Sequence, residues 1–123
     1  MLKNYKDLMV WQKSYQVCLD VYKITKEFPG EEKYSLSSQI RRAAVSVPSN
    51  IAEGYGRKTT PDYIRSLYIA YGSNCELETQ LLLAGDLGFT ESNSLQKALE
   101  GISEVERMLK ALIKSLENKH SNP

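Results

Sequence analysis

The residues that could carry out catalysis are few and widely separated in this chain of 123 residues. The only histidine, His120, is near the C-terminus, so no histidine is placed to act as a general base within a folded core. The two cysteines, Cys18 and Cys75, are too few for a zinc site, and their apolar neighbours favour two buried thiols over a disulfide. We therefore expect no enzyme activity, no catalytic residue, no cofactor and no metal ion. An enzyme site formed between subunits is the least favoured alternative.

Two other features could hold a ligand. The Gly54-Tyr55-Gly56 segment is too short to cradle a phosphate and is typical of a helix end. Eight tyrosines accompany only two phenylalanines. A tyrosine ring packs against apolar groups while its hydroxyl reaches water, which suits a subunit interface, although the ring also stacks on nucleic-acid bases. Of these two roles we favour the interface.

Four helical segments must position these side chains. The chain is divided by Pro29-Gly30, by the stretch from Gly54 to Pro61, and by Gly85 to Gly88. The predicted helices span residues 7–27, 36–54, 61–86 and 92–117, and residues 118–123 are expected to fray. Because the connections are short, consecutive helices should be antiparallel. The sequence therefore predicts a single all-α domain over residues 1–123, an antiparallel up-down-up-down four-helix bundle.

Composition agrees with a globular protein, because 41% of the residues are hydrophobic and 25% are charged. No apolar run approaches the roughly 18 residues that a membrane span requires. The first residues, MLKNYKDLMVW, lack the apolar core of a secretory signal. We expect a cytoplasmic protein without a membrane partner.

The first and third segments carry more apolar residues than one buried stripe needs. In the first, an aromatic face that includes Trp11, Tyr15 and Tyr22 lies opposite an aliphatic face. Since a small bundle buries one stripe per helix, the surplus is expected to contact another copy of the chain. The residues predicted for this homo-oligomer interface are Val10, Val17, Val21, Ile24, Phe28, Tyr68 and Ile69.

The charged residues separate along the predicted bundle, although the net charge is only +1. Residues 1–7, 53–65 and 107–123 meet at one end, called the basic end below, where nine basic residues face four acidic ones. A basic surface attracts a phosphate backbone without reading its sequence. Ordinary solubilising charge is the alternative. The candidate nucleic-acid contacts are Lys3, Lys6, Arg57, Lys58, Arg65, Arg107, Lys110 and Lys114.

Arg41 and Arg42 point in different directions from one predicted helix. Antiparallel pairing places them near the level of residues 73–74, about one turn from Glu76 and Glu78. We therefore predict an ion pair of Arg41 with Glu76 or Glu78, within one subunit or across an interface. If the pair is buried, removing one of its two residues would leave the other charge desolvated and without a partner.

Several segments, in one order, carry a family resemblance: DLMVWQKS at 7–14, Phe28-Pro29, QIRRAAVSVPSNIAEGYGR at 39–57 and SLYIAYGSNCELETQL at 66–81. Together they resemble the small bacterial four-helix-bundle proteins encoded within intervening sequences of 23S ribosomal RNA genes. The resemblance covers about residues 7–90 and implies a homo-oligomeric ring, a pentamer. A weaker likeness of fold and helix pattern links the chain to accessory proteins of diversity-generating retroelements, which contact a reverse transcriptase and nucleic acid.

The function predicted from these observations is non-enzymatic. The oligomeric bundle would bind RNA or DNA, or a protein that handles them, through its basic end. The alternative is a protein-interaction module that docks a partner through its surplus apolar faces and does not contact nucleic acid. Salt dependence separates the two, because phosphate contacts weaken steeply as salt rises.

Overall fold

The computed structural model describes residues 3–32 and 35–121. Over these residues the chain forms four α-helices and no strand. The helices are α1 (Met9–Lys26), α2 (Leu36–Tyr55), α3 (Thr60–Asp86) and α4 (Ser92–Ser121). Two short 3-10 turns, Tyr5–Asp7 and Gly30–Glu32, lie before and after α1.

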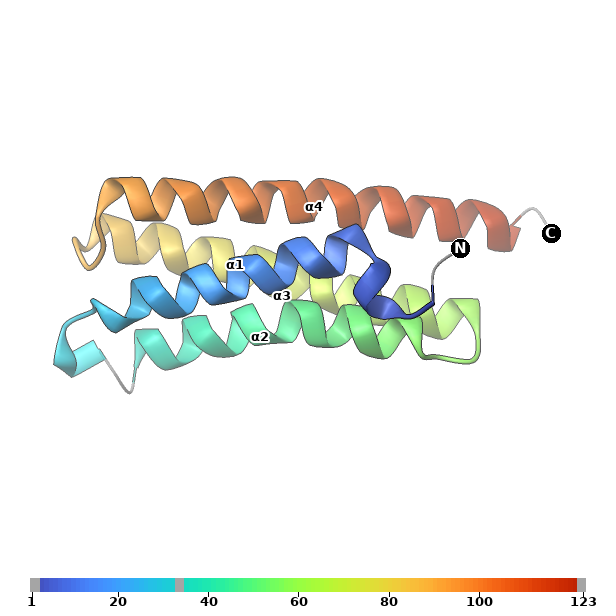
Figure 1. Cartoon of the computed structure of the whole chain (residues 1–123), viewed down its shortest axis with the longest axis horizontal. Coiled ribbons are helices and arrows are strands. Elements are labelled where there is room, and N and C mark those ends of the chain that lie inside the picture. The colour runs from blue at the N-terminus through green and yellow to red at the C-terminus, as the bar shows by residue number, and fades with distance from the viewer. Residues whose placement is uncertain (1–2, 33–34, 122–123) are drawn as a thin grey trace.

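The four helices form an antiparallel bundle (Figure 1). The main contacts of α1 are with α2 and α4, and those of α3 are with the same two helices, so α1 and α3 occupy diagonal positions. The N-terminal segment, the α2–α3 turn and the C-terminal part of α4 lie at one end of the bundle (Figure 1). The predicted all-α up-down-up-down arrangement is therefore confirmed.

Local capping explains where the helices begin and end. The Thr59 side chain accepts a hydrogen bond from the Asp62 amide at 3.3 Å, and Pro61 lies in the first turn of α3. The helix thus begins one residue earlier than predicted. Gly88 has a φ of 79°, and the Phe89 amide bonds to the Ala84 carbonyl at 2.9 Å, which ends α3 in a left-handed turn.

The end of α4 differs from the prediction. Residues 118–121 continue the helix to Ser121 and do not fray. Residues 122 and 123, also expected to fray, lie outside the described residues. No apolar residue follows Leu116 in α4, but the helix continues to Ser121 without one.

The aliphatic face of α1 builds the core, which corrects most of the predicted oligomer interface. The residues of α1 assigned to that interface, and Phe28 just after the helix, are each at most 8% exposed: Val10, Val17, Val21, Ile24 and Phe28. Inside the bundle, α1 approaches α4 closely at Gly101, where an added Cβ would lie 2.7 Å from a Val17 methyl carbon. The aromatic face was the one left outside, because tyrosine hydroxyls keep contact with water there.

Two apolar surfaces remain exposed. The first, the α1 aromatic face, consists of Trp11, Tyr15, Leu19 and Tyr22, of which the last three are 49%, 45% and 39% exposed. The second, the α3 outer stripe, consists of Ile69, Leu82 and Leu83, which are each 48–51% exposed. Tyr68 is also exposed, but it belongs to a groove beside α4. Because α1 and α3 are diagonal, the two surfaces face away from each other.

Pro48 does not interrupt α2, which continues from Leu36 to Tyr55 with the proline ring buried. Near it, the Asn50 side-chain amide donates to the Ser46 carbonyl at 2.9 Å and to the Ser46 hydroxyl at 3.0 Å. The Ser46 hydroxyl lies 2.7 Å from that of Ser73 in α3. These bonds fix a polar seam between α2 and α3.

Candidate nucleic-acid interface

The eight basic residues predicted to contact nucleic acid come from the segments that meet at one end of the bundle (Figure 1). Three segments supply them: the N-terminal segment, the region around the α2–α3 turn, and the C-terminal half of α4. All eight side chains are exposed: Lys3, Lys6, Arg57, Lys58, Arg65, Arg107, Lys110 and Lys114.

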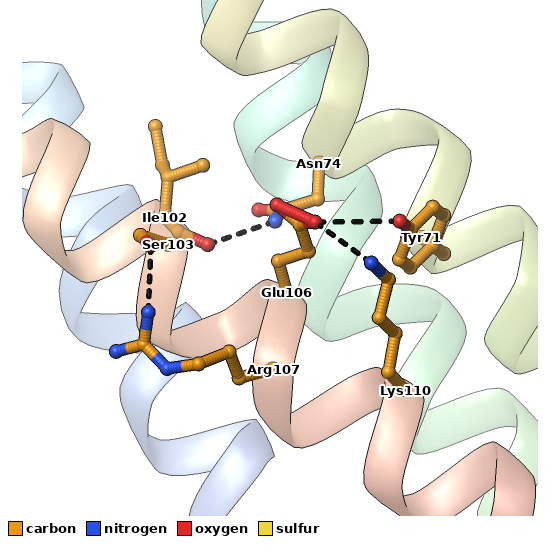
Figure 2. Close-up of polar contacts among 7 residues, drawn as sticks. All are labelled: Tyr71, Asn74, Ile102, Ser103, Glu106, Arg107 and Lys110. Atoms are coloured by element: carbon orange, nitrogen blue, oxygen red, sulfur yellow. Dashed lines mark hydrogen bonds and ion pairs between the residues drawn. The ribbon is translucent and has the colours of Figure 1, made fainter.

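Six of these eight cations form no ion pair and no side-chain hydrogen bond within the described part of the chain. They are Lys3, Lys6, Arg57, Lys58, Arg65 and Lys114. Of these, the Lys6 ammonium lies 5.9 Å from the centre of the Tyr5 ring. By contrast, Lys110 pairs with Glu106 at 3.2 Å, and Arg107 donates to the Ser103 hydroxyl at 2.8 Å (Figure 2). The unpartnered group is the part of the basic end whose charge is least neutralised.

A groove runs between α3 and α4 at this end. Its volume is about 400 Å³, and it is called the α3–α4 groove below. One wall carries two tyrosines from α3, and the other carries two lysines from α4. Its lining residues are Tyr68, Tyr71, Lys110, Ile113, Lys114 and Glu117. The sequence had assigned Lys110 and Lys114 to nucleic acid and Tyr68 to an oligomer interface, and the structure places the three together.

Polar contacts hold the two walls of the groove in register. The Tyr68 hydroxyl donates to a Glu117 carboxylate oxygen at 3.0 Å. The Tyr71 hydroxyl donates to Glu106 at 3.4 Å, and the Lys110 ammonium lies 5.8 Å from the centre of the Tyr71 ring. Figure 2 shows Tyr71 and Lys110 converging on the same Glu106 oxygen.

The charge states of the groove follow from these contacts. The hydrogen bond to Glu106, aided by Tyr71, raises the pKa of Lys110, so this side chain stays cationic. The hydrogen bond to Glu117 raises the pKa of Tyr68, which keeps the phenol protonated. The groove therefore places the Lys110 cation and the protonated Tyr68 phenol beside Tyr71 and Lys114.

Sequence reasoning missed the residues that position this groove. Neither Glu106 nor Tyr71 nor the buried Asn74 was singled out as part of a site. A signal was available in their spacing, because Tyr71 and Asn74 are three apart while Glu106 and Lys110 are four apart, so each pair shares a helix face. Spacing within one helix does not give the register between α3 and α4, so it could not show that the two pairs lie together.

The predicted ion pair of Arg41 is not formed within the chain. Its Nε donates to the Thr25 hydroxyl at 2.7 Å, and its guanidinium lies 4.7 Å from the centre of the Tyr22 ring. No ion pair joins Arg41 to Glu76 or Glu78 among the described residues. Arg41 turns toward α1, whereas the prediction had placed it against α3. Pairing across a subunit interface stays a prediction.

The two cysteines are free thiols. Cys18 is half-buried, but Cys75 is exposed, contrary to the expectation that both are buried. Burial raises the pKa of each thiol, and the nearby Glu106 and Glu78 carboxylates raise that of Cys75 further. Both side chains therefore stay protonated at neutral pH.

The described residues hold neither a cluster of metal ligands nor a membrane-spanning helix. Within residues 3–32 and 35–121, no three histidine, cysteine, aspartate or glutamate side chains are grouped so that they could hold a metal ion. None of the helices described is both long enough and apolar enough to span a membrane.

Comparisons with known proteins agree with the fold. A family model described as "23S rRNA-intervening sequence protein" matches residues 6–111. A solved structure from Bacteroides thetaiotaomicron, described as a protein with unknown function from the S23 ribosomal protein family, superposes with a TM-score of 0.81. Its sequence is 26% identical, and the match covers 89% of this chain and 98% of that one. No curated protein sequence gives a significant match.

Proposed function

The chain belongs to the 23S rRNA-intervening sequence protein family, and we propose that it is a non-enzymatic, homo-oligomeric nucleic-acid-binding protein of the cytoplasm. RNA or DNA binds at the basic end, with the α3–α4 groove as the central contact. A protein that handles nucleic acid is the other partner that this surface suits.

One observation carries the proposal: the groove combines two tyrosine rings with two lysines. Lysines neutralise backbone phosphates, and exposed aromatic rings stack on bases in a way that tolerates any sequence. The unpartnered Arg57, Lys58 and Arg65 extend the cationic surface around the same end. Such a site favours binding that depends on charge more than on base identity.

Self-association is supported by the two exposed apolar surfaces. The α1 aromatic face and the α3 outer stripe differ in composition and face away from each other. A contact between unlike surfaces is head-to-tail, and it closes into a ring when the rotation between copies permits. A ring aligns all basic ends on one side. We propose a ring of five, the number that the family resemblance implies.

Fluorescence anisotropy with short labelled RNA and DNA strands tests the binding. Lys114→Gln removes a groove cation that has no partner within the described residues, and Lys23→Gln removes an equally exposed lysine from the opposite half of the bundle. We expect Lys114→Gln alone to weaken binding and to lower the salt slope by about one per lost phosphate contact. Equal effects of both variants, or no binding by the wild type at low salt, would refute the proposal.

Light scattering behind a sizing column tests the assembly. A mass well above that of one 13.9 kDa chain is expected for the wild type. Leu19→Glu in the α1 aromatic face and Leu83→Glu in the α3 outer stripe should each lower it, whereas Ala111→Glu, an exposed substitution in α4, should not. A monomeric wild type would contradict this part of the proposal.

The second candidate function is docking of an unrelated protein on the apolar surfaces. The exposure of Tyr15, Leu19 and Tyr22 favours it. Binding of such a partner would change little with salt and would be lost in Leu19→Glu but kept in Lys114→Gln. The two candidates therefore predict opposite behaviour for this pair of variants.

A further inference from the structure

A second concave surface, distant in sequence from the groove residues, lies on α2 beside α1. Its volume is about 690 Å³. It is called the Arg41–Arg42 concavity below, and its lining contains two arginines and no carboxylate. Most of its residues belong to the sequence segment 39–57, which the proposed function does not use. The lining residues are Tyr22, Ser38, Arg41, Arg42, Val45, Ser46, Ser49 and Asn50.

Arg41 is held in place by α1. Its Nε donates to the hydroxyl of Thr25, which is only 4% exposed and which itself donates to the Val21 carbonyl at 2.9 Å. The guanidinium also stacks on Tyr22. Its Nη2 makes only a long contact, 3.5 Å, with the Tyr22 carbonyl, and its Nη1 makes no hydrogen bond within the described chain. Because the guanidinium is anchored through Nε, its Nη1 and Nη2 groups remain as donors for a ligand.

Arg42 contributes the second cation. It is exposed and forms no ion pair or side-chain hydrogen bond with any described residue. Ser38 and Ser46 lie four residues to either side, so all three share one face of α2. Glu76 of α3 lines an adjoining hollow together with Arg42, but the two form no ion pair.

Hydroxyl and amide groups complete the lining. Ser46 is fixed by its contacts with Ser73 and Asn50, while Ser38 and Ser49 keep unengaged hydroxyls within the described residues. The concavity therefore gathers more hydrogen-bond donors than a carboxylate can use. A phosphate has more oxygen acceptors and up to two negative charges, which match several donors and two guanidinium groups.

We propose that the Arg41–Arg42 concavity binds a phosphate group. The phosphate belongs either to a free nucleotide or to the backbone of a nucleic acid. This inference goes beyond the proposed function, because Arg41 and Arg42 are not among the basic-end residues. Failure of one proposal leaves the other intact, since Lys114→Gln is expected to leave phosphate binding here unchanged.

A ³¹P NMR titration of inorganic phosphate into the full chain, in phosphate-free buffer, tests the site. We expect wild-type protein to broaden or shift the phosphate signal. Arg42→Gln should weaken binding by about tenfold or more, as expected for loss of charge-assisted hydrogen bonds. Arg57→Gln is the matched control, because this arginine is also exposed and forms no ion pair with any described residue, but it lies at the basic end. Equal weakening by both variants would overturn the proposal.

A second variant and three further probes sharpen the result. Val45 is 41% exposed, so Val45→Glu adds a carboxylate to the lining without disturbing the core, and it should abolish phosphate binding. Adenosine monophosphate represents a free nucleotide, and a dinucleotide with only an internal phosphodiester represents a nucleic-acid backbone. Binding of either probe supports the site if Arg42→Gln weakens it. Acetate should bind more weakly. No binding of any phosphate probe, or acetate binding as tight as phosphate, would overturn the proposal.

Discussion

The side-chain amide of Asn74 in α3 donates a hydrogen bond to the main-chain carbonyl of Ile102 in α4 at 3.0 Å, where Asn74 is only 2% exposed (Figure 2). This buried bond sets the register between the two helices one turn away from the α3–α4 groove. The groove therefore depends on a polar contact inside the bundle.

Asn74→Ala should lower the free energy of unfolding by about 1–3 kcal/mol, because it deletes the bond and opens a small cavity. Urea denaturation measures the change. Ser115→Ala, an exposed substitution in α4, should stay within about 0.5 kcal/mol of the wild type. Equal stabilities of Asn74→Ala and the wild type would show that the buried amide does not hold the helices together.

Gly101→Ala should destabilise the bundle by about 1–3 kcal/mol, because its new Cβ would lie 2.7 Å from a Val17 methyl carbon. Combining it with Val17→Ala should recover part of the loss. Gly72→Ala is the control, since nothing lies within 4 Å of its added Cβ. Because glycine is unfavourable inside a helix, Gly72→Ala should raise the free energy of unfolding by about 0.5–1 kcal/mol. A Gly101→Ala variant as stable as wild type would contradict the close α1–α4 approach.

Arg41→Ala should cost about 1 kcal/mol through loss of its bond to Thr25 and its stacking on Tyr22. A double-mutant cycle with Thr25→Val should show coupling between the two side chains. Glu78→Gln should leave stability unchanged. The reverse pattern, with coupling to Glu78 and none to Thr25, would restore the ion pair predicted from the sequence.

The Tyr68–Glu117 contact predicts a pH dependence at alkaline pH. The folded pKa of Tyr68 is raised above its ordinary value of 10.0, because Glu117 accepts a bond from the neutral phenol. The contribution of this contact to stability is therefore fully present below pH 10.0 and is lost as pH rises through the raised pKa. NMR titration of the tyrosine ring carbons should show the pKa falling in Glu117→Gln. An unchanged Tyr68 titration in that variant would rule the contact out.

The sequence predicted the bundle because its helix boundaries depend on local signals. Pro61 and the residues around it start α3, and Gly88 ends it. The buried face of α1 was harder to predict from the sequence. Both faces are apolar, and helical periodicity does not indicate which of them packs into the core. Val17 and Val21 proved to be core residues and Tyr15 proved to be exposed.

The candidate sites were predictable only in part. Lys110 and Lys114 were found from charge alone, because net charge along a bundle follows from helix order. Their pairing with Tyr68 and Tyr71 depends on the rotation of α3 against α4, which a single helix pattern does not contain. Arg41 was placed against the wrong neighbour for the same reason, since its height along the bundle was estimated but its direction was not.

The diagonal placement of α1 and α3 has a consequence for assembly. In the proposed assembly each copy would be bifunctional in the sense used for monomers of a polymer, because a contact made through the α1 aromatic face would leave the α3 outer stripe of the same copy unoccupied. Assembly through these two surfaces would have a direction, like that of a filament with two different ends. Only closure into a ring would satisfy both ends, so in the proposed ring the rotation between neighbouring copies, and not the strength of any one contact, would set the number of subunits.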